Sequence, residues 1–153
     1  MSDRKIQDII ARFGLEPHVE GGAFRELYRD GRRSEGREAS GVIYYYLGPE
    51  ERADFHVLDS DEYWLYHGGS PLEIWMIEPE GGVRVETLGL EEGAQPCALV
   101  KGGVIFGARH RPGAEDGTLV SCVTVPEFSY GQYRILSREE MLDAWPACES
   151  FWK

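Results

Sequence analysis

Apolar residues recur along the chain with two spacings, one helical and one typical of β-strands. Near the N-terminus, Ile6, Ile9, Ile10 and Phe13 follow helical spacing, which predicts a short amphipathic helix over 3–13. Near the other end, Ser137-Arg138-Glu139-Glu140 forms a capping-box pattern ahead of two apolar residues. It predicts a second short helix over about 138–145.

Between these helices, from about residue 17 to 136, short runs rich in Val, Ile, Tyr and Phe are separated by turn-forming residues. No helical pattern lies between the runs, so parallel β-α-β units are not expected. The pattern predicts an all-β sandwich or barrel with a central cavity, formed by the whole chain as one domain over 1–153. The candidate strands are 22–29, 40–47, 54–58, 62–67, 72–79, 82–88, 97–100, 103–109, 118–126 and 130–136.

The amino-acid composition narrows the classes of binding partner. The 153 residues include 27 acidic and 16 basic side chains, a formal charge of −11, which disfavours nucleic acid and anionic membrane surfaces. The three cysteines show no metal-type pair and no disulfide framework, so we expect reduced thiols.

No signal-peptide pattern is present at the N-terminus, which predicts a cytoplasmic protein. The charged stretch 29–38 is interpreted as a mobile surface connection, with a lid over a barrel mouth as the alternative.

Several segments along the chain form a distinctive set. They are Pro17-His18-Val19-Glu20-Gly21-Gly22-Ala23-Phe24-Arg25-Glu26-Leu27-Tyr28-Arg29, Val42-Ile43-Tyr44-Tyr45-Tyr46-Leu47, Phe55-His56-Val57-Leu58-Asp59-Ser60-Asp61-Glu62-Tyr63-Trp64, Gly68-Gly69-Ser70-Pro71-Leu72 and Thr124-Val125-Pro126-Glu127-Phe128. They resemble the cupin 5 family of the cupin superfamily, long described as a domain of unknown function, and the resemblance runs in order from about residue 6 to 136. It implies an RmlC-like double-stranded β-helix, or jelly roll, with short flanking helices, usually assembled as a homodimer.

Cupins that bind metal usually supply three histidines and a glutamate from two motifs. In this chain His56 and Glu62 match the first histidine and the glutamate, whereas Leu58 and Phe106 stand at the other two histidine positions. Hydrocarbon side chains donate no electron pair, and one imidazole with one carboxylate would hold a divalent ion only weakly. No cofactor is therefore expected; any metal would be bound by His56 and Glu62.

His56 and Glu62 are also the candidate catalytic residues. One interpretation is a buried pair, retained from a metal-binding ancestor, in which imidazole and carboxylate satisfy each other. The other is a general acid/base pair, since a histidine beside a carboxylate relays protons near neutral pH.

Further candidates would contact a substrate. Trp64 and Tyr66 share the strand phase of Glu62. Of the tyrosine triplet, the pair Tyr44 and Tyr46 is predicted to face the cavity rather than Tyr45 alone. For Arg25 two interpretations stay open, an ion pair with Glu20 or Glu26 and a contact with an anionic group at the barrel mouth. The predicted substrate-binding residues are Arg25, Tyr44, Tyr46, Trp64, Tyr66, Phe106 and Tyr130.

Three functions remain open at this level. The first is a metal-independent isomerase or epimerase that uses His56 and Glu62 on a small, partly apolar or ring-shaped molecule. The second is a ligand-binding or sensory protein that makes and breaks no bond. The third is a metal-dependent enzyme, which Leu58 and Phe106 disfavour. The apolar tail 150–153 is expected to pack on its own barrel or on a partner subunit.

Overall fold

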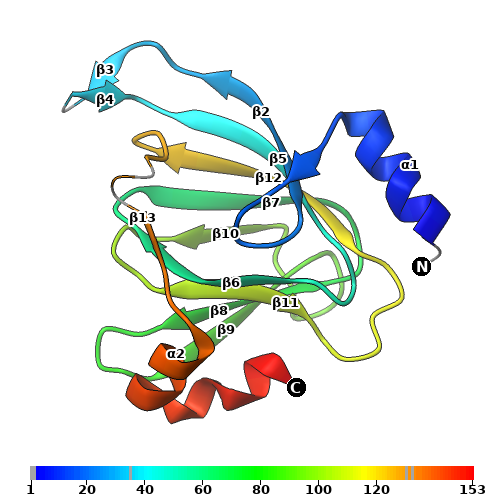
Figure 1. The fold of residues 1–153 in the computed structure, drawn as a ribbon, viewed down its shortest axis with the longest axis vertical. Helices are drawn as coiled ribbons and strands as arrows, with labels where there is room; N and C mark the ends of the chain where they lie inside the picture. The colour runs from blue at the N-terminus through cyan, green and yellow to red at the C-terminus, as the bar shows by residue number, and fades with distance from the viewer. Residues whose placement is uncertain (1–2, 35, 130, 132) are drawn as a thin grey trace.

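The computed structural model describes residues 3–34, 36–129, 131 and 133–153. Most of them form two antiparallel sheets that face each other (Figure 1). The strand order is β1-β2-β5-β12-β7-β10 in the six-stranded sheet and β13-β6-β11-β8-β9 in the five-stranded sheet, with a separate β3-β4 pair. The strands are β1 Glu16–Pro17, β2 Ala23–Arg29, β3 Arg33–Ser34, β4 Arg37–Glu38, β5 Gly41–Leu47, β6 Arg52–Leu58, β7 Asp61–Gly69, β8 Leu72–Ile77, β9 Val83–Leu88, β10 Cys97–Val100, β11 Phe106–His110, β12 Thr118–Val125 and β13 Tyr133–Ile135.

Alternation along the strands separates an interior from two outer faces. Inward-facing side chains such as Leu72, Ile74, Trp64, Phe106 and Val120 form the core between the sheets. Each is almost completely buried, which removes its apolar surface from water and stabilises the closed sandwich. The predicted jelly roll is confirmed.

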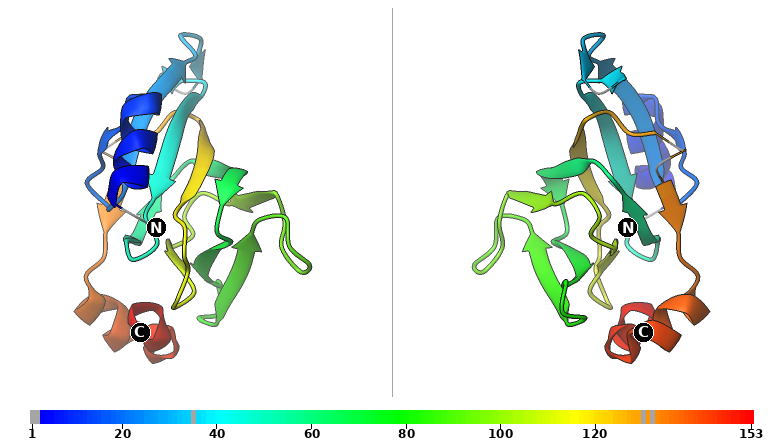
Figure 2. Two further views of the ribbon diagram at one scale, coloured as in Figure 1. Left: turned by 90° about the vertical axis from the view of Figure 1, so that its right-hand side faces the viewer. Right: turned by 90° about the vertical axis from the view of Figure 1, so that its left-hand side faces the viewer.

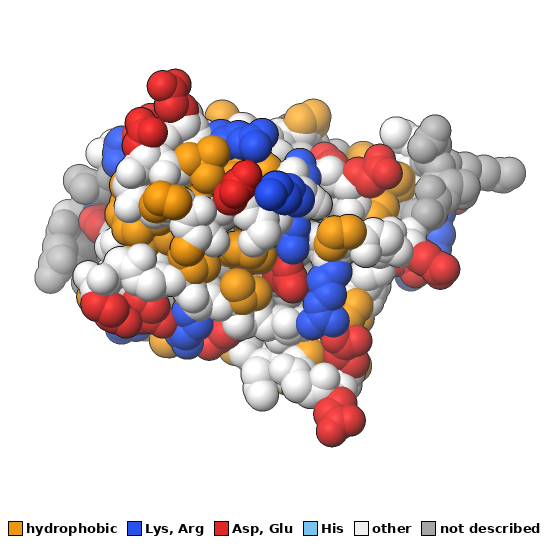
Figure 3. Space-filling model, turned by 90° about the horizontal axis from the view of Figure 1, so that it is seen from below, with side chains coloured by type: hydrophobic (Ala, Val, Ile, Leu, Met, Phe, Trp, Pro, Cys, Tyr) orange, Lys and Arg blue, Asp and Glu red, His pale blue; other side chains and the backbone are white. Residues whose placement is uncertain are grey.

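Helical segments cover the two outer faces (Figures 1 and 2). Helix α1, Asp3–Phe13, packs its apolar face with Tyr44 and Tyr46 on the six-stranded sheet. Helix α2, Arg138–Ala144, and the 3-10 helix η2, Pro146–Trp152, pack with Phe55 and Trp75 on the five-stranded sheet. Seen from below, the side on which α2 and η2 lie in Figure 1, the surface carries charged side chains of both signs interspersed with apolar ones (Figure 3).

Helices α1 and α2 begin where the sequence predicts them. Ser137 accepts a hydrogen bond from the Glu140 N–H, and the Glu140 side chain accepts one from the Ser137 N–H, so the capping box is present. The tail packs on its own barrel, because Phe151 is fully buried against the five-stranded sheet. Assembly as a homodimer stays a prediction.

Some local predictions were incomplete or wrong. The strands β1, β3 and β4 and the 3-10 helix η2 were not predicted. The candidate strand over 103–109 is observed as β11, which runs from Phe106 to His110 and buries His110. None of the helices in the described part of the chain has the length and apolar character needed to span a bilayer.

Candidate functional site

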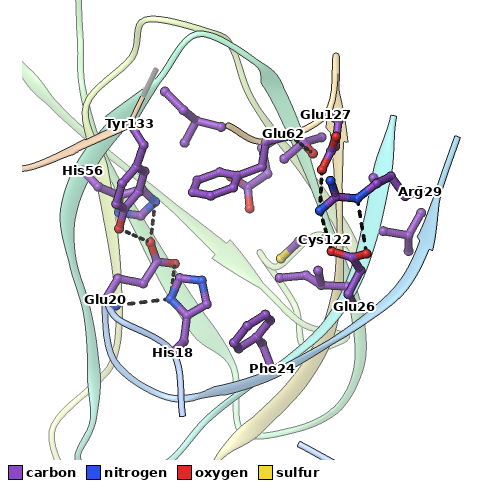
Figure 4. A pocket seen from close by; sticks show the side chains of 16 residues that line it. His18, Glu20, Phe24, Glu26, Arg29, His56, Glu62, Cys122, Glu127 and Tyr133 are labelled. Carbon is purple, nitrogen blue, oxygen red and sulfur yellow. Dashed lines mark hydrogen bonds and ion pairs between the residues drawn. The ribbon is translucent and has the colours of Figure 1, made fainter. Parts of the chain in front are cut away.

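One end of the barrel interior holds a partly open cavity of about 200 Å³. Inward-facing side chains from both sheets line it (Figure 4). Much of this lining is hydrocarbon, from Phe24, Val42, Ile43, Leu58 and Phe128. An apolar cavity with a few converging polar groups is the usual form of a small-molecule site.

The turn before β2 brings Glu20 to this cavity. Gly21 and Gly22 have φ of 112° and 71°, which side chains with a Cβ rarely adopt. A Cβ would also lie 2.1 Å from the Arg52 carbonyl oxygen at Gly21 and 2.5 Å from that of Tyr46 at Gly22. The paired glycines therefore allow the turn to press against the strands, and the buried Glu20 side chain enters the barrel.

Glu20 is the partner of His56. The distance from His56 Nε2 to Glu20 Oε2 is 3.3 Å, and the Tyr133 hydroxyl donates to the same oxygen at 2.9 Å. On the other side of the imidazole ring, Nδ1 lies 2.6 Å from the Asp54 carbonyl oxygen. A carbonyl only accepts, so Nδ1 carries a hydrogen and Nε2 faces the carboxyl group.

His18 lies against the other side of Glu20. Its Nδ1 accepts a hydrogen bond from the Glu20 backbone N–H at 3.2 Å, which leaves that nitrogen without a hydrogen. Burial lowers the pKa of His18, and His56 lowers it further, although the Glu20 carboxyl group acts in the opposite direction. His18 is therefore neutral, and its 3.9 Å approach to Glu20 Oε1 is not an ion pair.

Glu62 enters the cavity from β7 and lies apart from this group (Figure 4). Burial and, to a smaller extent, the Glu20 carboxyl group raise its pKa to about 8, and only a hydrogen bond with the Cys122 thiol acts against them. No ion pair links Glu62 to a basic side chain among the described residues. Glu62 is thus a neutral carboxylic acid at pH 7.

The rim of the cavity holds Arg29 among carboxyl groups. A β-bulge after Glu26 inserts one residue into β2, so that Arg29 falls on the same face as Phe24 and Glu26. Arg29 Nη2 lies 2.9 Å from Glu26 Oε2 and 2.8 Å from Glu127 Oε1.

The structure corrects the predicted positions of three residues. Arg25 points to the outer face of β2, where its Nη1 donates to the Phe13 carbonyl oxygen at 3.3 Å, so it neither lines the cavity nor pairs with Glu20 or Glu26. Tyr44 and Tyr46 share the outer face of β5 and pack against α1, whereas the single Tyr45 lies on the opposite face and points to the core. Sequence reasoning missed Glu20, Tyr133 and Arg29 as residues of the cavity.

The remaining candidates lie behind the cavity wall. Trp64 and Phe106 are buried in the core, and the Phe106 ring lies 4.1 Å from the His56 ring. Tyr66 packs on the same core and donates to the Gly69 carbonyl oxygen. None of the three lines the cavity. Tyr130 lies outside the described residues.

The four positions of the usual cupin metal set all face the barrel interior. Their chemistry does not fit a metal ion, because Leu58 and Phe106 present hydrocarbon and His56 Nε2 is directed at Glu20. Within the described ranges, no group of three or more His, Cys, Asp and Glu side chains is placed to hold one. His56 and Glu62 are also not paired with each other, contrary to one interpretation of the sequence.

Comparisons with known proteins place these features in a family. The family model described as Cupin superfamily (DUF985) matches residues 7–136. An X-ray structure of a protein from Shewanella oneidensis is similar with a TM-score of 0.87 at 36% identity, over 95% of this chain and 93% of that one. A hypothetical protein from Leishmania major is similar with a TM-score of 0.85 at 31% identity, over 94% of both chains.

More distant structures share only the fold. Oxalate decarboxylase from Bacillus subtilis matches with a TM-score of 0.61 at 16% identity, over 78% of this chain and 29% of that one. No curated protein matches the chain.

Proposed function

The chain belongs to the cupin 5 family, and we propose that it binds a small, partly apolar molecule and moves a proton on it without a metal ion, as an isomerase or epimerase does. The observation that carries the proposal is that two glutamates in unlike environments face one cavity. Glu20 is paired with His56 and hydrogen-bonded by Tyr133, whereas Glu62 is buried without a basic partner. Environments that differ in this way divide a pair of carboxyl groups into a base and an acid.

Glu20 is the proposed base. His56 and Tyr133 both act on Oε2, which leaves Oε1 without a hydrogen bond among the described side chains. Oε1 accepts the proton from a carbon next to a substrate carbonyl group, while His56 and Tyr133 fix the orientation of the carboxyl group.

Glu62 is the proposed acid. The electron pair of the broken C–H bond forms a C=C bond, and the carbonyl oxygen gains the negative charge. A carboxylic acid that keeps its proton at pH 7 donates a hydrogen bond to that oxygen and stabilises it. Return of the proton to another carbon gives an isomer, and return to the other face of the same carbon gives an epimer. The apolar wall keeps water away from the charged intermediate.

The experiment follows exchange of hydrogen for deuterium next to the carbonyl group of cyclohexanone and acetophenone, by proton NMR in D₂O. We expect catalysed exchange that persists after dialysis against a chelator, and a loss of about 100-fold in Glu20→Gln and Glu62→Gln. Glu50→Gln, which changes an exposed carboxylate outside the cavity, is the matched control. Exchange no faster than in buffer, or unaffected by either cavity variant, would contradict the proposal, and restoration by added metal would contradict its metal independence.

The apolar lining favours a second candidate, a binding protein that catalyses no reaction. It predicts saturable binding of the same ketones, seen as thermal stabilisation, that persists in Glu20→Gln without any exchange in the wild-type protein.

A further inference from the structure

The rim of the cavity surrounds one arginine with three carboxyl groups. Besides its contacts with Glu26 and Glu127, the Arg29 guanidinium approaches Glu38, with 3.4 Å between Nε and Oε2. Burial and the neighbouring Glu38 carboxyl group raise the pKa of Glu127, although Arg29 acts in the opposite direction. With Glu127 protonated, the two remaining carboxylates still outweigh the single positive charge of Arg29, so the rim carries a net negative charge.

The interior offers no unpaired positive charge either. His56 is directed at Glu20, and His18 is neutral because its Nδ1 accepts the Glu20 backbone N–H. Among the described residues that line the cavity, these histidines and Arg29 are the only basic side chains. A carboxylate or phosphate entering here would lose its hydration without gaining a cation.

A cationic ligand would bind weakly deeper in the cavity, for a related reason. The rim would attract an ammonium group, but the carboxyl group of Glu20 is already paired and Glu62 carries its own proton. An ammonium group beside the apolar wall would have no carboxylate to compensate it. An uncharged molecule avoids both the desolvation cost of an anion and the uncompensated charge of an ammonium group.

We infer that Arg29, Glu26, Glu38 and Glu127 form a charge filter that admits uncharged carbonyl compounds and rejects carboxylates and phosphates. The inference rests on the proposed function, because it concerns the substrate of that same cavity. It makes Glu26 and Glu127 specificity-determining residues: by occupying Arg29, they prevent it from binding an anion.

The test compares three ring compounds of similar size that differ in charge: acetophenone, benzoate and benzylamine. Dissociation constants for the wild-type protein are measured by ligand-observed NMR at pH 7. We expect acetophenone to bind at least about tenfold more tightly than either charged compound.

A rim variant then reverses the selection. Glu26→Gln/Glu127→Gln removes two of the three carboxylates around Arg29 and leaves it only the longer contact with Glu38, so the affinity for benzoate relative to acetophenone should rise about tenfold or more. Adding Arg29→Gln should abolish that rise, and Glu50→Gln should leave the ratio unchanged. Glu26→Gln alone should give a smaller change in the same direction, and because this side chain is half exposed, the single variant provides a test that does not depend on a buried substitution.

Each result separates this inference from the proposed function. Benzoate or benzylamine binding as tightly as acetophenone to the wild-type protein, no response in the rim variants, or no binding of acetophenone would overturn the charge filter. Catalysed exchange in cyclohexanone would still support proton transfer in those cases. Charge selection without any exchange would instead retain the filter and contradict the enzyme.

Discussion

The two ends of the barrel interior each bury a titratable side chain in its neutral form, yet only one end forms a site. At one end His110 is 5% exposed and burial lowers its pKa to about 4. At the other end Glu62 is 8% exposed and burial raises its pKa to about 8. Strand β12 connects the two, from Thr118 beside His110 to Cys122 beside Glu62.

The difference lies in what surrounds each group. His110 Nε2 is hydrogen-bonded to the Thr118 hydroxyl at 2.7 Å, and that hydroxyl donates to the Ser70 carbonyl oxygen, so this nitrogen is already used within the fold. Glu62 instead borders a cavity that its neighbours do not fill. Burial displaces a pKa at both ends, but His110 borders a depression among charged surface side chains, whereas Glu62 borders a largely apolar cavity inside the barrel, where a displaced pKa can serve chemistry.

The largest expected effect comes from placing a charge in the closed part of β12. Val120 is completely buried and faces inward, so Val120→Asp would bury a carboxyl group without a partner and cost about 4 kcal/mol or more of unfolding free energy. Thr124→Asp, on the same strand face but lining the cavity, should cost less than half as much. Chemical denaturation compares the two, and equal losses would show that the two ends do not differ in this way.

The next effect concerns Glu62 and pH. The unfolded chain loses this proton near pH 4.5, whereas the folded protein keeps it up to about pH 8. The stability from burying the neutral group is therefore complete below pH 4.5 and is lost as the pH rises towards 8. Relative to Glu62→Gln, the wild-type protein should lose up to about 1.4 kcal/mol per pH unit in this window. Parallel stability curves for the two proteins would rule out a raised pKa.

His110 should show the opposite dependence, over a narrower window. Its pKa is lowered from 6.5 to about 4, so its contribution is complete above pH 6.5 and is lost as the pH falls towards 4. Relative to His110→Gln, the wild-type protein should lose up to about 1.4 kcal/mol per pH unit there. Denaturation at pH 7 and 4.5 measures the change, and a difference between the proteins that is the same at both pH values would argue against a buried neutral histidine.

The smallest effect is expected from Tyr133→Phe. It removes the hydrogen bond to Glu20 Oε2 and should cost about 1 kcal/mol, because the carboxyl group keeps His56 as a partner. If Glu20 is the base, the exchange rate should fall in the same variant. Tyr28→Phe, at an exposed tyrosine, is the control; identical behaviour of the two variants would mean that the hydroxyl does not support Glu20.

Much of the fold follows from local pattern. Helix α1 and the main strands lie close to their predicted positions, because alternation and helical spacing record which side chains are buried. The same alternation placed His56, Glu62 and Trp64 in the interior. The positive φ of Gly21 and Gly22 is likewise a property of the residues themselves, because glycine adopts it without a Cβ clash.

The site was predicted less well. Strand phase alone leaves open which face of β5 lines the barrel, and the packing of α1 on Tyr44 and Tyr46 decides it. A bulge after Glu26 changes the phase within β2, so Arg29 faces the cavity although Arg25, before the bulge, lies on the outer face. Neither event has a signature in the hydrophobic pattern.

By itself, then, the sequence determined a cupin barrel, its flanking helices and the loss of two metal ligands at Leu58 and Phe106. Only the tertiary structure decided that His56 pairs with Glu20, so that Glu62 has no basic partner among the described residues. The physical reason is that periodicity specifies the side of a strand on which a residue lies, whereas partners depend on distances between segments far apart in the chain. The turn at Gly21 and Gly22 sets that distance by bringing Glu20 against β6.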